Sequence, residues 1–374
     1  MPSKTDAVAR LLAVSCLLLC LYNSCSRPAQ SKDTDQILTK PIVAIPPIVK
    51  QNDKQKVIDQ STKVETLADP PLTPIDHSKR PTIALALGGG GTRGAAHIGV
   101  IRALNQAGVP IDEIVGCSMG AVVGGLYAAG LPIDDVQNIL LDKSLAKAYI
   151  PAPFKVRFLQ MPFVRLCDQL THRYAGFYSG TKFQKYLESK IPTNCRSFDN
   201  LKIPFLAVAT NLLDGKAYAL SSGNLAAAIH ASSAISPLLK PIAIDDKLFV
   251  DGGVRANLPA CAARDSGADL VIAVVADEPL QPVSAERFTH MRNIAIRTAD
   301  IVLAVNDDHQ IPFADVIIYP DVHSIPVLTN NPEYVRRAIK AGELAGERAI
   351  PTILRLIKEK EAAQSRTASL SGTK

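Results

Sequence analysis

Two glycine-rich turns, each between an apolar strand-like run and a helix-like segment, constrain the fold of this chain more than any other feature. The first turn, Gly88 to Gly94, follows the run 82–87 (TIALAL) and precedes a segment with apolar residues at helical spacing. The second turn, 116–120 (GCSMG), follows the apolar stretch 111–115 and precedes AVVGGLYAAG. Successive strand–turn–helix units predict an α/β fold with a parallel or mixed sheet covered by helices on both faces.

The second turn has the chemistry of a nucleophile site. Its GxSxG pattern between a strand and a helix is typical of the nucleophile elbow, in which a sharp turn projects a serine hydroxyl above the sheet. Gly116 and Gly120 flank the serine because the backbones come too close at such a turn for side chains. We therefore predict that Ser118 is a nucleophile, activated by a neighbouring base.

The first turn is suited to holding negative charge. Backbone amides converge there with the positive end of a helix dipole, so the loop can bind an anion or a developing oxyanion. Gly89, Gly91 and Gly94 also satisfy the GxGxxG pattern of dinucleotide folds, but the acidic residue expected about 20 residues on is missing from the end of the next strand. A nucleotide-binding protein is therefore the most distant of the alternatives.

The candidate base is a carboxylate. None of the seven histidines stands at a strand end that would make it a triad partner. Asp251, in contrast, ends the short apolar run 247–250 and is followed by Gly252 and Gly253. A plain Asp-Gly turn is the alternative interpretation of this feature.

Taken together, these elements resemble the patatin-like phospholipase family, and most closely its bacterial branch related to the neuropathy-target-esterase lipid hydrolases. Residues 89–94 (GGGTRG) are similar to the family's oxyanion loop, 116–120 to its nucleophile elbow and 251–253 (DGG) to its aspartate motif. The resemblance extends from about residue 82 to 357 and includes the segments 96–104, 228–242, 257–259 and 267–274.

The resemblance implies a three-layer α/β/α fold with a central, mostly parallel sheet, and a catalytic Ser–Asp dyad. Ser118 would attack the acyl carbonyl and Asp251 would act as its base. The oxyanion hole would be formed by residues of the glycine loop, namely Gly89, Gly90, Gly91 and Arg93. Further motif glycines would support the turns, namely Gly94, Gly116, Gly120, Gly252 and Gly253. No cofactor and no metal is implied.

Three further residues occupy family positions near the site. His230 replaces the arginine that often precedes Ala-Ser in the family, which leaves open a structural substitution or a catalytic or pH-sensing role. His97 and Asn257 fit family positions and are expected to support the site rather than to take part in the chemistry.

The sequence outside the catalytic segment indicates export and attachment to a membrane. Residues 1–25 have the basic start and short apolar centre of a signal peptide, and Cys25 is either the lipidated first residue of a lipoprotein or incidental to ordinary cleavage. A disordered, proline-punctuated tether is expected over 26–80, the catalytic domain over 81–360 and a disordered tail over 361–374. The expected location is the periplasm or the cell surface.

Composition narrows the choice of partners. With 47% hydrophobic residues in 374, the chain can bury a large core, and it has no apolar run of about 20 residues that would make it a polytopic membrane protein. The absence of CxxC and HExxH patterns argues against zinc. A formal charge of +6 favours a lipid surface rather than nucleic acid as partner. The mixture of basic and large apolar residues in 145–176 suits the surface of an anionic bilayer, or a core-packed connection with a solvated basic face. The oligomeric state is not indicated.

The function predicted from these features is hydrolysis of lipid esters through an acyl-enzyme. Two alternatives stay open. A lipid acyltransferase would use the same acyl-enzyme but transfer the acyl group to an alcohol, and a lipid-binding lipoprotein on a hydrolase fold would be catalytically silent.

Overall fold

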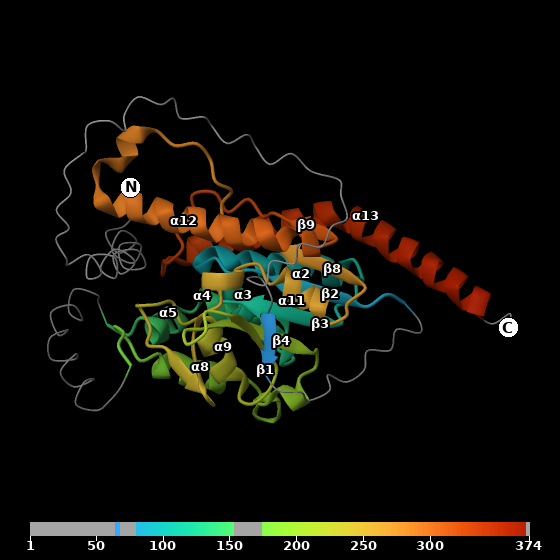
Figure 1. Ribbon diagram of the computed structural model, residues 1–374, viewed down its shortest axis with the longest axis horizontal. Coiled ribbons are helices and arrows are strands. Elements are labelled where there is room, and N and C mark those ends of the chain that lie inside the picture. Colours follow the sequence, from blue (N-terminus) through green and yellow to red (C-terminus); the bar gives the residue numbers. More distant parts are fainter. Residues whose placement is uncertain (1–63, 68–79, 153–173, 372–374) are drawn as a thin grey trace, which may run out of the picture.

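The computed structural model describes residues 64–67, 80–152 and 174–371 (Figure 1). The predicted signal peptide with Cys25 lies outside these residues, as does the middle of the basic and apolar segment 145–176. Both predictions therefore stay predictions.

A nine-stranded mixed sheet runs through the centre of the described chain in the order β1-β5-β4-β3-β2-β8-β9, with β7 paired to β4 and β6 to β7. Five of the eight strand pairs are parallel, so the expected mostly parallel sheet is confirmed. The strands are β1 Val64–Leu67, β2 Ile83–Leu87, β3 Glu113–Cys117, β4 Phe205–Asn211, β5 Ala217–Leu220, β6 Ile242–Ile244, β7 Lys247–Asp251, β8 Leu270–Val274 and β9 Val316–Ile318.

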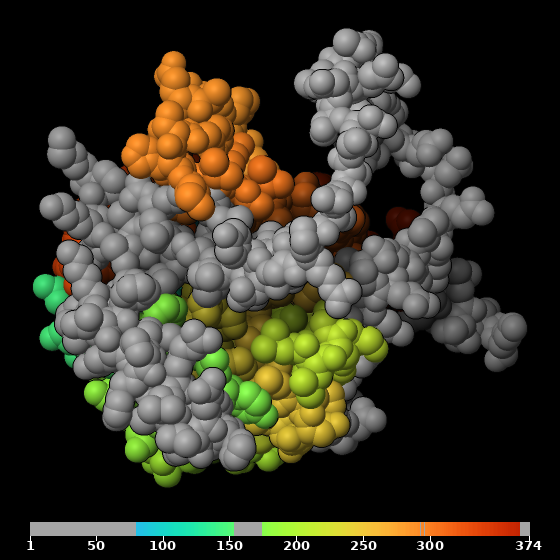
Figure 2. Space-filling model, turned by 60° about the vertical axis from the view of Figure 1, so that its left-hand side comes forward, coloured from blue at the N-terminus to red at the C-terminus, as the bar shows by residue number. Residues whose placement is uncertain are grey.

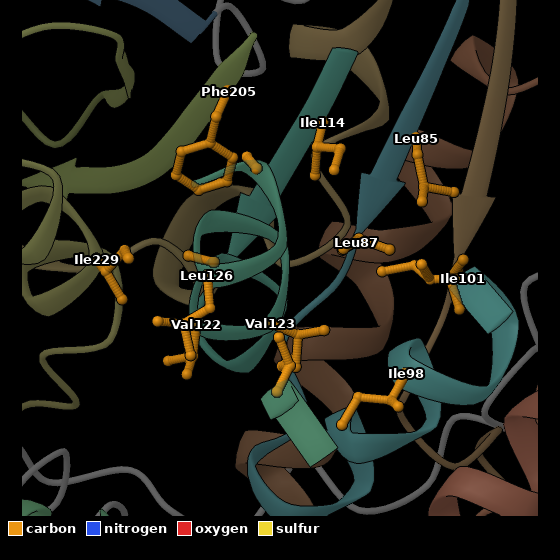
Figure 3. Close-up of a cluster of buried hydrophobic side chains, with 14 of the residues drawn as sticks. Leu85, Leu87, Ile98, Ile101, Ile114, Val122, Val123, Leu126, Phe205 and Ile229 are labelled. Atoms are coloured by element: carbon orange, nitrogen blue, oxygen red, sulfur yellow. The ribbon is translucent and has the colours of Figure 1, made fainter. Parts of the chain in front are cut away.

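Helices cover both faces of the sheet, which gives the three layers. Along β2, Ile83, Leu85 and Leu87 point into one apolar layer while Ala84 and Ala86 point into the other, because side chains alternate along a strand. The larger layer packs against α2 Ala96–Gln106, α3 Met119–Ala128, α4 Ile133–Leu141, α5 Lys143–Tyr149, α8 Thr181–Lys190, α9 Leu225–Ser232 and α13 Pro332–Ser371 (Figure 3). The smaller layer packs against α10 Gly253–Ala256 and α11 Ala260–Asp265.

The remaining helical segments are α12 Met291–Gln310 and short 3-10 turns. Those turns are η2 Gly91–Ala95, η3 Thr193–Cys195, η4 Phe198–Asn200, η5 Ala285–Thr289 and η6 Ile311–Phe313. In Figure 2 the orange residues around η5 and the start of α12 project from the body of the protein. None of the helices within the described ranges is both long enough and apolar enough to cross a membrane.

Two parts of the structure differ from the sequence prediction. Within the predicted tether, β1 pairs in parallel with β5, whose outer edge otherwise presents unpaired backbone groups. At the carboxyl end, α13 continues to Ser371, so residues 361–371 are helical rather than a disordered tail. Ala, Glu, Lys, Gln and Arg dominate 358–366, and these strong helix formers prolong a helix whose earlier turns are anchored in the core.

Candidate active site

The candidate site lies where two strands meet head to head beside β4. β3 pairs with β4 through Cys117 and Val208, and β7 pairs antiparallel with β4 through Asp251 and Ala209. Because β5 occupies the other edge of β4, β3 and β7 run toward each other along a single edge. Their last residues therefore meet, and Ser118, the residue after β3, comes level with Asp251.

Ser118 stands on a strained turn. Its backbone has φ 52° and ψ −118°, a conformation that residues with a side chain rarely adopt and that costs about 1–3 kcal/mol. The flanking glycines permit the turn. A Cβ on Gly116 would lie 2.6 Å from the carbonyl oxygen of Gly120, and a Cβ on Gly120 would overlap the carbonyl oxygen of Leu87. The predicted elbow geometry is present, with α3 beginning at Met119.

Ser118 and Asp251 form a direct hydrogen bond. The serine Oγ donates to Asp251 Oδ2 at 2.8 Å, and the amide of Gly253 donates to Asp251 Oδ1 at 2.8 Å. Burial, the largest effect, and the charge of Asp277 raise the pKa of Asp251, while the hydrogen bonds from Gly253 and Ser118 lower it, and the net value is about 6. The site thus joins a serine hydroxyl, the predicted nucleophile, to a carboxylate that is more basic than an exposed aspartate.

Residues 232–234, at the end of α9, hold both members of this pair by their backbones. Ser232 Oγ accepts from the Ser118 amide at 3.0 Å, and Ser233 Oγ donates to the Ser118 carbonyl at 3.1 Å. The amide of Asp251 donates to the carbonyl of Ala234 at 3.0 Å. Sequence analysis missed this clamp, although the segment 228–242 that contains it carries part of the family resemblance.

The glycine loop presents two uncommitted amides. Among the described residues, the structure gives the backbone N–H groups of Gly90 and Gly91 no acceptor. Gly90 has φ 141° and packs so closely that a Cβ would lie 2.7 Å from the carbonyl oxygen of Ala276. The amide of Gly89 differs from the prediction, because it donates to the carbonyl of Asn257 at 3.0 Å and is not free for an oxyanion.

Arg93 anchors the glycine loop. The guanidinium is buried; its Nε donates to the carbonyl of Ile325 at 2.8 Å, and it forms ion pairs with Asp277 at 3.6 Å and Glu278 at 3.1 Å. These contacts tie the loop to the segments that follow β8 and β9. A direct role of Arg93 in the oxyanion hole stays a prediction.

The remaining motif glycines lie at close contacts. A Cβ on Gly94 would lie 2.7 Å from the Cβ of Met119, and one on Gly252 would overlap the carbonyl oxygen of Val208. Together with Gly253, whose amide binds Asp251, they let the three motifs approach one another.

The two candidate histidines lie in the core, and in the described part of the chain no histidine is hydrogen-bonded to Ser118 or Asp251. His97 Nε2 lies 2.7 Å from the carbonyl oxygen of Gly88, and burial lowers its pKa to about 4. The ring of His230 packs edge-on against Phe183 with centroids 5.8 Å apart, and burial lowers its pKa to about 4 as well. This environment favours the structural interpretation of His230.

Asn257 connects the site to two further carboxylates that sequence analysis did not single out. Its Nδ2 donates to Asp277 Oδ2 at 3.0 Å and to Asp307 Oδ2 at 3.1 Å. Asp277 follows the carboxyl end of β8, a position where polar residues often serve a site, but Asp307 lies inside α12 and carries no such signal. The described residues contain no group of three or more His, Cys, Asp or Glu side chains that could hold a metal ion.

Comparison with known proteins identifies relatives of this segment. Residues 85–264 match the family model described as patatin-like phospholipase. An uncharacterised NTE family protein from Mycobacterium tuberculosis is 39% identical over 197 residues, which are 53% of this chain and 49% of that protein. Patatin-like phospholipase domain-containing protein 7 from mouse is 33% identical over 51% of this chain and 13% of its own length. Patatin-like phospholipase domain-containing protein 6 from human is 32% identical over 52% of this chain and 13% of its own length.

The chain spans about half the length of the first curated relatives it matches, or less. Among solved structures, VipD from Legionella pneumophila aligns with a TM-score of 0.41 and 16% identity, over 73% of this chain and 67% of that chain.

Proposed function

We propose that this chain, whose residues 85–264 match the family model described as patatin-like phospholipase, is a serine acyl hydrolase that cleaves lipid esters through Ser118 and Asp251. The observation that carries the proposal is the 2.8 Å hydrogen bond from Ser118 Oγ to a buried Asp251 carboxylate, beside the amides of Gly90 and Gly91, which have no acceptor among the described residues. Two of the relatives described above are named as an NTE family protein and a patatin-like phospholipase domain-containing protein, which supports a lipid as the substrate class.

The proposed reaction passes through an acyl-enzyme. Ser118 Oγ attacks the ester carbonyl carbon while Asp251 takes the hydroxyl proton, and the amides of Gly90 and Gly91 donate to the oxyanion that forms. When the oxyanion collapses, the alcohol leaves with the proton from Asp251 and the acyl group stays on Ser118. Water then attacks the acyl-enzyme and gives a proton to Asp251. When this second intermediate collapses, Asp251 returns the proton to Ser118 Oγ as the leaving group, and the acid is released.

The raised pKa of Asp251 suits this role. At about 6, it leaves the carboxylate ionised at neutral pH, yet makes it a stronger base than an exposed aspartate. The strained turn contributes as well, because it holds Ser118 Oγ in the geometry of attack before the substrate binds.

Fluorophosphonate labelling of the purified protein tests the proposal. We expect labelling of the wild type, loss of labelling and of ester hydrolysis in Ser118→Ala, and at least a 100-fold loss of hydrolysis in Asp251→Asn. Ser222→Ala, at an exposed serine, serves as the matched control. Labelling or hydrolysis that persists in Ser118→Ala would refute the proposed nucleophile.

The same experiment separates the alternatives. A silent lipid-binding protein would bind lipid without being labelled. For a labelled protein, product analysis with and without an added alcohol distinguishes a hydrolase, which releases free acid in both cases, from an acyltransferase, which forms a new ester.

We further infer that the protein works at a lipid surface. The exposed side of α12 carries large apolar side chains that water does not favour: Met291, Ile294, Ile301, Val302 and Val305. Replacing Ile294 and Ile301 by serine is expected to lower co-sedimentation with anionic vesicles while hydrolysis of a soluble ester is retained. Leu354→Ser, at an exposed position of α13, is the control, and unchanged vesicle binding in the α12 variant would contradict the inference.

A further inference from the structure

A single amide group joins two carboxylates that come from different parts of the chain. Asn257 Nδ2 lies 3.0 Å from an oxygen of Asp277, after β8, and 3.1 Å from an oxygen of Asp307, in α12. Asp307 is 7% exposed and Asn257 5% exposed. The two carboxylates therefore accept from one nitrogen; that of Asp307 is largely removed from water, whereas the Asp277 side chain is 21% exposed.

This carboxyl pair stands directly behind the glycine loop. The carbonyl of Asn257 accepts the Gly89 amide at 3.0 Å, and the side chain of Asn257 fills the space that a Cβ on Gly89 would need. Arg93, in the same loop, pairs with Asp277 at 3.6 Å. Asn257 and Asp277 thus hold the loop whose Gly90 and Gly91 amides we assign to the oxyanion.

The charges around the pair do not balance if both carboxyl groups are ionised. Arg93 forms ion pairs with Asp277 and Glu278, whereas no ion pair of Asp307 is found in the described structure. Asp307 Oδ1 is buried without a hydrogen-bond partner there. A buried anionic oxygen without a donor costs more than a neutral one, so the geometry favours a proton on one member of the pair.

We propose that Asp277 and Asp307 share one proton at neutral pH and act, with Asn257, as positioning residues that keep a single negative charge behind the oxyanion loop. The proposal rests on the proposed function. A second negative charge there would oppose the oxyanion that forms during acyl transfer, and would loosen the loop by repulsion between the two carboxylates. The rate of acyl transfer should therefore fall when the pair loses its proton.

The titration expected of Asp307 agrees with this proposal. Burial, the largest effect, and the charge of Asp277 raise its pKa, while hydrogen bonds from Asn257 and the Leu258 amide lower it, and the net value is about 7. Burial also raises the pKa of Asp277, which Arg93 lowers.

Three other titratable groups interact with the carboxyl group of Asp307. Asp308, the next residue of α12, raises the pKa of Asp307 as well. Asp307 in turn helps to raise the pKa values of Cys117, at the end of β3, and of Tyr319, after β9. Both of those groups are neutral near pH 7 when their pKa values are raised. Asp300 raises the pKa of Asp277, and the charge of Asp277 helps to raise the pKa of Asp251, which at about 6 ionises at a lower pH than Asp307.

The first test is the pH profile of kcat/KM for a soluble short-chain ester from pH 5 to pH 9. In the wild type we expect a rise as Asp251 ionises, then a fall above pH 7 of about tenfold, the size expected for one charge added near a developing oxyanion. Asp307→Asn keeps the amide-sized side chain without a charge and should lose the alkaline fall. The exposed Asp308→Asn should retain it. An alkaline fall that is the same in Asp307→Asn as in the wild type would overturn the proposal.

The second test does not depend on catalysis. Carboxyl ¹³C shifts of aspartate-labelled protein, assigned by comparison with Asp307→Asn, should show a carboxyl group that titrates near pH 7. A midpoint for Asp307 below pH 5 would refute the shared proton even if Ser118 proves to be the nucleophile. If Ser118→Ala remains fully active, the proposed function fails, and this titration still decides whether the pair holds a proton.

Discussion

Replacing the proposed catalytic base should make the protein more stable at neutral pH. Asp251 is buried, and folding raises its pKa from 3.8 to about 6, mainly because burial disfavours the charged form. In Asp251→Asn the amide can still donate to Ser118 Oγ and accept from the Gly253 amide, the two partners that the carboxylate has now. The substitution therefore removes the buried charge while its hydrogen bonds are preserved.

The structure sets both the size and the pH range of the effect. Because the pKa of Asp251 is higher in the folded than in the unfolded protein, the folded state holds its proton more tightly, and ionisation lowers the free energy of unfolding as the pH rises from about 4 to about 6. A shift of about two pKa units corresponds to about 3 kcal/mol, which is fully lost above pH 6. Asp251→Asn should thus match the wild type near pH 4 and exceed it by up to about 3 kcal/mol at pH 7.5.

Urea unfolding of both proteins at pH 4.5, 6 and 7.5 measures this difference. The exposed Asp321→Asn is the control and should show no pH-dependent gain. Equal stability of Asp251→Asn and the wild type at pH 7.5, or a gain that is the same at all three pH values, would refute the reasoning. We expect the stabilised variant to be inactive, as is common where an active site is built from strained or desolvated groups.

Three further predictions follow from the geometry and from the sequence. Gly120→Ala should destabilise the protein by at least about 2 kcal/mol in urea unfolding, because its Cβ would overlap the Leu87 carbonyl; an unchanged midpoint would contradict the close approach of the two backbones. Burial lowers the pKa of His230 to about 4, so acid protonates the unfolded protein first and lowers the free energy of unfolding of the wild type by about 2 kcal/mol between pH 7.5 and pH 5. His230→Leu should abolish this part of the pH dependence, and an identical pH dependence in the variant would argue against the buried neutral ring. Cys25→Ser, expressed in a bacterium, should lose a lipid modification visible in the intact mass and move to the soluble fraction, whereas a mass without lipid in both proteins would favour ordinary cleavage.

Local features of the fold could be predicted from the sequence because they depend on residues close in the chain. The turn at Ser118 needs only Gly116, Gly120 and their flanking segments, and α3 begins directly after it, as the elbow pattern predicts. β5 and β6 were missed, since strands of four and three residues carry too little periodicity to be distinguished from loops. β1 was missed because only its pairing with β5 makes it a strand.

The contacts around the site are harder to predict because they join distant residues. The backbone partner of Gly89 is Asn257, far along the chain, and nothing near Gly89 indicates that its amide is occupied. Likewise, Asp307 lies 50 residues from Asn257, on a helix whose sequence shows an ordinary acidic end. A motif predicts which residues gather at a site, whereas the state of each donor and acceptor depends on the packing of elements that the motif does not contain.

The arrangement of strands explains how a carboxylate can take the place of a histidine in this site. An imidazole bridges a serine and an aspartate that stand apart, but here β3 and β7 end against each other on β4, and one carboxyl group spans the gap between them. The same closure buries Asp251 under the 232–234 segment, and burial is what raises its pKa toward that of a useful base. Proximity and basicity therefore have one structural cause. Any change that opened the junction between β3 and β7 should weaken the hydrogen bond and the base together.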